Sequence, residues 1–120
     1  MAQTLPPALE QELQKFDTMR RNHETLQMLV QSMQQELSET KATLEELRKQ
    51  PDDVATYKAV GQVLFRADKA KLVEELDDKA KTLEMGLASR KKQLESLSEK
   101  LKELQNKIQI ELGKHNLQLQ

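Results

Sequence analysis

The residues that could carry out acid–base or metal chemistry are few and scattered along this chain. The two histidines, His23 and His115, are far apart in the sequence, and there is no cysteine. No HExxH motif or phosphate-binding glycine loop accompanies them, so the sequence gives no support for a metal or nucleotide site. Glu45-Glu46 and Glu74-Glu75 are adjacent acids of the kind that helix surfaces expose to water. We therefore predict no catalytic residue, no metal and no cofactor.

The chemistry that the sequence does offer is apolar contact, and its first source is the stretch 54–66. β-Branched and aromatic residues lie on both sides of Gly61, which can adopt the positive φ of a tight turn. This pattern predicts a β-hairpin, with an irregular loop as the alternative. A two-stranded hairpin alone is marginal in water, and its edges are unpaired. We therefore expect oligomerisation through this hairpin, by closing several hairpins into a sheet or barrel over Val60, Val63, Leu64 and Phe65.

A second apolar group lies toward the two ends of the chain. Its members near the start are Leu5, Leu9, Leu13 and Phe16, and those near the end are Ile108, Ile110, Leu112, Leu117 and Leu119. Ile108, Ile110 and Leu112 do not share one helical seam, so at least one of them faces solvent or a partner. Apolar side chains on frayed helix ends form an adaptable, sticky surface. The alternative is that these residues only complete a core.

Two long heptad-patterned segments, about residues 9–47 and 72–111, must position both apolar groups. The twelve a and d positions from Leu9 to Leu47 hold nine apolar residues, and the twelve from Val73 to Glu111 hold ten. Apolar residues at this spacing, about 3.5 residues, are typical of a coiled-coil seam. About two dozen residues join the seams, so the second helix can fold back antiparallel, with residue i facing roughly residue 120 − i.

The predicted fold class is mainly α: a long antiparallel two-helix coiled coil with a β-hairpin at the bend. We expect a single domain over 1–120, with helices at 5–50 and 69–112, the hairpin region at 51–68 and a tail at 113–120. Pro6 and Pro7 suit a first helical turn, and Pro51 disfavours helix at the residue before it. Asp68 fits an N-cap of the second helix.

Composition excludes several partner classes. Of the 120 residues, 37% are apolar, 2% are aromatic and 32% are charged, which is the profile of exposed helices with a narrow seam. Nineteen basic and twenty acidic residues give a net charge of −1, so no basic excess points to nucleic acid or anionic lipid. No run of 18 apolar residues occurs in the sequence, and residues 1–7 contain no apolar stretch of the kind that a secretory leader has. We expect a soluble intracellular, cytoplasmic protein that binds neither nucleic acid nor membrane.

The order helix, hairpin, helix and the residues of the hairpin carry a resemblance to a known family. The chain resembles the β-type subunits of prefoldin, particularly the archaeal form, over about residues 5–112. The most specific segments are Pro51-Asp52-Asp53, Tyr57-Lys58, Val60-Gly61 and Val63-Leu64-Phe65. One hairpin and 120 residues favour the β type over the longer α type, and eukaryotic prefoldin subunit 6 is a near relative. The coiled-coil segments match in length and period, as any coiled coil would.

This resemblance implies a function and roles for particular residues. Prefoldin is a hexamer of two α-type and four β-type subunits whose hairpins form β-barrels. The tips of its arms hold non-native polypeptides and deliver them to a group II chaperonin without ATP. The implied assembly residues are Tyr57, Val60, Gly61, Val63, Leu64 and Phe65. The implied client-binding residues are Leu5, Leu9, Leu13, Ile108, Ile110 and Leu112. The alternative function is a structural coiled-coil scaffold whose hairpin only reverses the chain and which binds no client.

Overall fold

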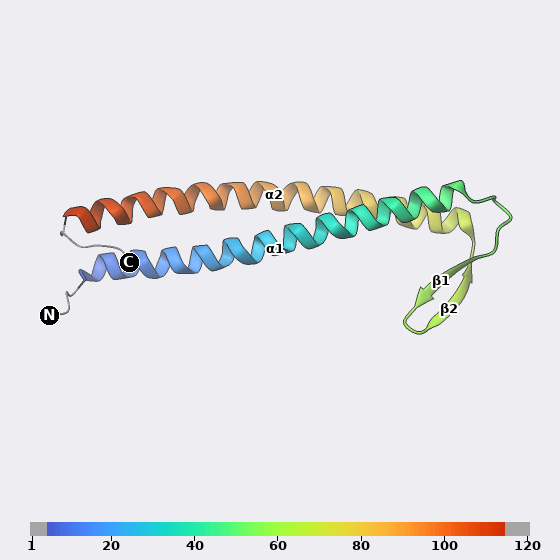
Figure 1. Ribbon diagram of the computed structural model, residues 1–120, viewed down its shortest axis with the longest axis horizontal. Helices are drawn as coiled ribbons and strands as arrows, with labels where there is room; N and C mark the ends of the chain where they lie inside the picture. The colour runs from blue at the N-terminus through green and yellow to red at the C-terminus, as the bar shows by residue number, and fades with distance from the viewer. Residues whose placement is uncertain (1–4, 115–120) are drawn as a thin grey trace. The chain divides into compact units, whose positions relative to one another are not determined.

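The computed structural model describes residues 5–114 and contains four elements in the order helix, strand, strand, helix (Figure 1). These are α1 (Pro7–Lys49), β1 (Thr56–Val60), β2 (Val63–Ala67) and α2 (Lys69–Lys114). The predicted fold class, two long helices joined by a β-hairpin, is confirmed. The predicted tail at 113–120 differs, since Gly113 and Lys114 continue α2, and residues 115–120 lie outside the described part.

The bounds of α1 follow from the residues at its two ends. Pro7 is the first helical residue, where no N–H is needed, and the Glu10 amide donates to the Pro6 carbonyl at 3.0 Å. Glu10 lies in the first turn and Arg48 and Lys49 in the last, which suits the helix dipole at both ends. The helix stops two residues before Pro51, as that proline predicts.

The strands form an antiparallel hairpin with a two-residue connection. The pairing runs from Thr56 opposite Ala67 to Val60 opposite Val63, which leaves Gly61 and Gln62 at the turn. Gly61 has a φ of 60°, which a residue with a Cβ adopts only at a cost. The glycine that indicated the turn therefore stands at the position that requires it.

The helix α2 begins directly after Asp68 and ends later than predicted. The amide of Leu72 donates to the Asp68 carbonyl at 3.0 Å, so Asp68 occupies the predicted N-cap position. At the other end, α2 runs through Gly113 to Lys114, two residues beyond the prediction. A glycine costs a helix about 1 kcal/mol relative to alanine, which is too little to stop it by itself.

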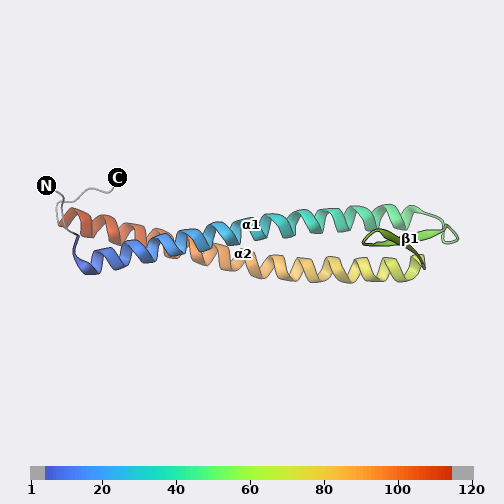
Figure 2. The ribbon, with the colours of Figure 1, turned by 90° about the horizontal axis from the view of Figure 1, so that it is seen from below.

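The chain forms two compact units, each built from one part of α1 and one part of α2. The first unit comprises residues up to Leu29 and from Arg90, and the second comprises Val30–Ser89, including the hairpin. Within the first unit, His23 Nε2 lies 2.7 Å from Ser98 Oγ. Within the second, an ion pair joins Lys41 to Glu84 at 2.8 Å. The helix segments of each unit are therefore antiparallel neighbours, as both views show (Figures 1 and 2).

The heptad positions of α1 are the ones that turn inward. Every predicted a and d residue of α1 is buried or half-buried. Pairs such as Glu12 with Lys107 and His23 with Ser98 fit the predicted rule that residue i faces roughly residue 120 − i. In α2, Arg90 is the exception, because its d position is exposed and its guanidinium donates to Gln93 Oε1 at 3.0 Å. A long cationic side chain reaches water from such a position.

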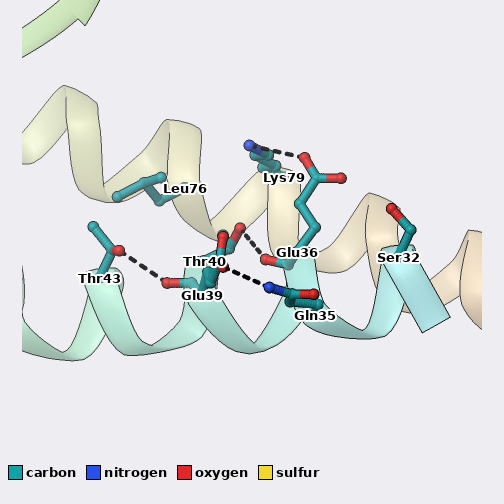
Figure 3. Close-up of a pocket in the computed structure, with 8 residues that line it drawn as sticks. All are labelled: Ser32, Gln35, Glu36, Glu39, Thr40, Thr43, Leu76 and Lys79. Carbon is teal, nitrogen blue, oxygen red and sulfur yellow. Dashed lines mark hydrogen bonds and ion pairs between the residues drawn. The ribbon is translucent and has the colours of Figure 1, made fainter.

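A polar groove accompanies the seam of the second unit (Figure 3). Thr40 is buried at a d position, and its hydroxyl donates to the Glu36 carbonyl at 2.8 Å. Lys79 pairs with the Glu36 carboxylate at 3.2 Å, across the two helices. Most of the polar groups drawn in this groove bond to one another or to the backbone of α1. We therefore interpret the groove as a structural feature of the helix pair and not as a ligand site.

We expect the Gly86→Ala variant to be slightly more stable than the natural chain. A Cβ at Gly86 would lie 2.9 Å from Met33 Cε, the free end of a flexible side chain that can move aside. The helix gains up to about 1 kcal/mol from alanine, less the cost of moving Met33. Urea unfolding followed by circular dichroism measures the difference. A loss of stability would show that Met33 is held in place.

Candidate functional site

The residues with conventional catalytic potential are engaged in ordinary structural contacts. His23 is half-buried in the seam beside Ser98, and His115 lies outside the described residues. Glu45 pairs with Lys49, and Glu75 pairs with Lys58. Within residues 5–114, no group of three acidic or histidine side chains could hold a metal ion. Within the same range, no helix combines the length and the apolar character needed to cross a membrane.

The hairpin presents the main exposed apolar surface of the second unit. The predicted assembly side chains are all more than half exposed, and Leu64 is the most exposed of them at 68%. The members of this hairpin surface are Tyr57, Val60, Val63, Leu64 and Phe65. Exposed apolar side chains clustered on a two-stranded sheet are typical of a surface that another chain covers.

Both faces of the hairpin take part in this surface. Residues opposite one another across the strands share a face, so Leu64 lies with Ala59 and Tyr57 with Arg66 on one side. The other side carries the Val60–Val63 pair and the Lys58–Phe65 pair. A hairpin with one apolar face could lie on a core, whereas this one needs cover on both sides.

The predicted client-binding residues are divided between buried and exposed positions. Leu9, Ile108 and Leu112 form a buried cluster in the first unit, which we call the free-end cluster. Leu5 and Leu13 pack against it, half-buried. The exception is Ile110, which is 59% exposed. The structure therefore brings five of the six residues together in the core of the helix pair, and their role with clients stays a prediction.

Two polar residues at these surfaces were not singled out from the sequence. Glu12 lies next to the free-end cluster, where its Oε1 pairs with Lys107 Nζ at 3.0 Å. Its Oε2 is buried and has no hydrogen-bond partner among residues 5–114. Lys69 contacts the end of α1 from the start of α2. The sequence did contain a signal for each residue. Glu12 is an acid at a d position of the seam, and Lys69 is a cation at a helix N-terminus, and both placements are unfavourable by local rules.

We expect the Gly61→Ala variant to weaken assembly by up to about fivefold to thirtyfold, because the strained turn opens the hairpin of the free chain and assembly must then close it again. A residue with a Cβ at a φ of 60° costs about 1–2 kcal/mol, although nothing else lies near enough to clash. Titration of the variant into a partner subunit, followed by light scattering, measures the change. Gln62→Ala, at the neighbouring turn position, is the control and should assemble normally. Equal assembly of both variants would contradict the prediction.

Geometry first defines a class of protein. Two long heptad-patterned helices pair antiparallel within each unit, and the hairpin between them exposes apolar side chains on both faces. This combination defines a helical, coiled-coil subunit with a β-hairpin suited to assembly, and comparisons with known proteins agree with it. The family model described as "Prefoldin subunit" matches residues 10–115.

Similar proteins identify the family. Prefoldin subunit beta of Thermococcus gammatolerans is 42% identical over 110 residues, covering 92% of this chain and 94% of the relative. The Pyrococcus horikoshii subunit beta is 37% identical with the same coverage. The crystal structure of the prefoldin beta subunit from Thermococcus strain KS-1 has a TM-score of 0.78 at 36% identity, covering 90% of this chain and 95% of that one. The chain belongs to the prefoldin family of chaperone subunits and is of the β type.

Proposed function

We propose that this chain is the β-type subunit of an ATP-independent chaperone that holds unfolded polypeptides and passes them to a group II chaperonin. Its partners would be two α-type prefoldin subunits and three further copies of itself in a hexamer. The activity would take place in the cytoplasm. The observation that carries this proposal is the hairpin surface, which is apolar on both faces in a chain of the prefoldin family.

Assembly through the hairpin follows from what the isolated chain leaves uncovered. A two-stranded sheet has two unpaired edges, and closing several hairpins into a barrel removes all of them. Burial of apolar area contributes roughly 25 cal/mol per Å², so covering five large side chains from each subunit is a substantial driving force. The side chains that would supply this contact are Tyr57, Val60, Val63, Leu64 and Phe65. The turn between the strands depends on Gly61.

Client binding would use the residues at the other ends of the helices. Unfolded chains expose apolar segments of no fixed sequence, which favours several weak apolar contacts over one shaped pocket. Six linked arms would convert weak contacts into useful avidity. Release to a chaperonin would then need only competition among weak sites, without a nucleotide. The residues proposed to contact the client are Leu5, Leu9, Leu13, Ile108, Ile110 and Leu112.

A coiled-coil scaffold without client binding is the second candidate. One observation favours it: Leu9, Ile108 and Leu112 are buried, so the free-end cluster completes a core as it stands. A scaffold of this kind would use the hairpin only to reverse the chain, and it would stay a monomer or dimer. The two functions therefore differ both in assembly through the hairpin and in client binding at the free end.

The deciding experiment measures assembly and client protection together. Light scattering on the chain alone and mixed with an archaeal α-type prefoldin subunit should show a mass near six subunits only in the mixture. The mixture should also suppress the aggregation of a denatured client. Deleting 1–10 and 108–120 should leave assembly intact and abolish this protection. A mixture that assembles but never protects would overturn client binding, and one that neither assembles nor protects would favour the scaffold.

A further inference from the structure

Lys69 joins the two ends of the segment that carries the hairpin. Its ammonium donates to the Gln50 carbonyl at 2.6 Å and to Asp52 Oδ1 at 3.0 Å. The side chain is only 11% exposed, whereas that of Asp52 is fully exposed. Lys69 is the first residue of α2, and Gln50 directly follows the last residue of α1. One side chain therefore bridges the end of one helix and the start of the other.

The placement of this lysine is unfavourable by local rules. The N-terminus of a helix carries partial positive charge, which repels a cation, and burial removes the water that would solvate it. The contact with Gln50 offsets these costs, because carbonyl groups at the end of α1 have no partner within the helix and carry partial negative charge. The ammonium of Lys69 thus caps the C-terminal end of α1 from the other helix.

The bridge lies at the base of the hairpin, where β1 begins and β2 ends. The turn at 51–54 is closed by the Val54 amide, which donates to the Pro51 carbonyl at 3.1 Å, and β1 starts at Thr56. On the other side, β2 ends at Ala67, two residues before Lys69. A second, exposed link joins Lys58 of β1 to Glu75 of α2 at 2.9 Å. Exposed ion pairs of this kind contribute little free energy. The contacts of Lys69 are therefore the ones that can hold the hairpin in a fixed orientation.

We propose that Lys69 is a positioning residue that sets the direction in which the hairpin leaves the helix pair of the second unit. In an assembly built through hairpins, this direction fixes the direction of the helical arm. That consequence rests on the proposed function. The orientation itself is a property of the isolated chain, because all of the bridging groups belong to it.

The test measures the orientation directly. The chain has no cysteine, so a Ser38→Cys, Gln62→Cys pair places spin labels on α1 and on the hairpin turn without competing sites. Both positions are exposed. In this background we expect Lys69→Met to broaden the label-to-label distance distribution severalfold in double electron–electron resonance. We expect Lys69→Arg, which keeps a cation, to restore most of the narrow distribution.

Lys71→Met is the matched control. Lys71 lies two residues further along α2 and is exposed, so the variant removes the same charge without touching the bridge. It should leave the distribution narrow. An unchanged distribution in Lys69→Met, or equal broadening in Lys71→Met, would overturn the proposal. Loss of the cross-strand nuclear Overhauser effects between Val60 and Val63 in Lys69→Met would also overturn it, because Lys69 would then hold the hairpin together.

The assembly measurement separates this proposal from the proposed function. Suppose that the label-to-label distance distribution is narrow in the natural chain and broad in Lys69→Met. We then expect the variant to form less hexamer than the natural chain when each is mixed with an α-type subunit. If the natural chain itself fails to assemble, the proposed function fails, while the distance measurement still decides the role of Lys69.

Discussion

In the Leu64→Asp variant we expect assembly with an α-type prefoldin subunit to be lost while the isolated chain keeps its helices and its stability. Leu64 is 68% exposed, so an aspartate costs the isolated chain little. In an interface built from hairpins the same carboxylate is buried against apolar side chains, which costs several kcal/mol when no partner neutralises it. The expected loss of affinity is at least about a thousandfold, since about 1.4 kcal/mol is tenfold. Light scattering over a titration measures it.

Met85→Asp is the control for a charge placed on exposed apolar surface elsewhere. Met85 lies on α2 in the same unit and is 76% exposed, so its replacement should leave assembly unchanged. Val63→Asp tests the other face of the hairpin, and we expect it to weaken assembly as well. Normal assembly of Leu64→Asp would show that its face stays in water. Equal losses from Leu64→Asp and Met85→Asp would show that net charge, and not the hairpin surface, is responsible.

The helices and the hairpin could be predicted because their signals are local and periodic. Heptad positions identify the buried side of α1 from Leu9 to Leu47, including polar members such as Thr40. Gly61 and the β-branched residues around it identify the turn and both strands. Arg90 occupies a d position of the heptad pattern but is exposed. A long cationic side chain can extend from such a position into water.

The exposure of the candidate site residues was predictable in part, and their roles stay predictions. The exposed hairpin residues could be identified because a two-stranded hairpin with apolar residues on both faces cannot bury them by itself. The spacing of Ile108, Ile110 and Leu112 indicated that they could not all share one seam, and the structure shows that Ile110 is the one outside. The bridge from Lys69 to Gln50 was beyond sequence reasoning, because it depends on where two distant segments meet in space.

Glu12 is the residue at which stability and client binding should oppose each other. Its Oε2 is buried without a partner in the described part of the chain, and it lies one helical turn from Leu9. A buried oxygen without a hydrogen bond costs about 1–3 kcal/mol. Separation of the helix ends would return that oxygen to water and would expose the free-end cluster. The carboxylate therefore favours the separated state, in which Leu9, Ile108 and Leu112 would be open to a client under the proposed function.

We expect Glu12→Leu to raise the free energy of unfolding by about 1–3 kcal/mol and to weaken client protection by the assembled complex. The leucine removes the unpartnered oxygen and adds apolar contact to the cluster. It also ends the pairing with Lys107, which is worth little because Lys107 is 64% exposed. If the same free-energy change applies to separation of the helix ends, the separated state becomes roughly 5- to 150-fold rarer. Urea unfolding and the suppression of client aggregation, measured on the same preparation, report the two effects.

Thr40→Val is the matched control, because it also replaces a polar d residue with an apolar one. Thr40 lies in the second unit and its hydroxyl is already bonded to Glu36, so client protection should not change. Improved stability with undiminished protection in Glu12→Leu would contradict the prediction, because clients would then bind without opening the cluster. Ile110→Ser distinguishes that case: Ile110 is exposed already, so a client bound to the closed end would depend on it. Client binding through a closed end would make the exposed face of α2, and not the buried seam, the surface that selects clients.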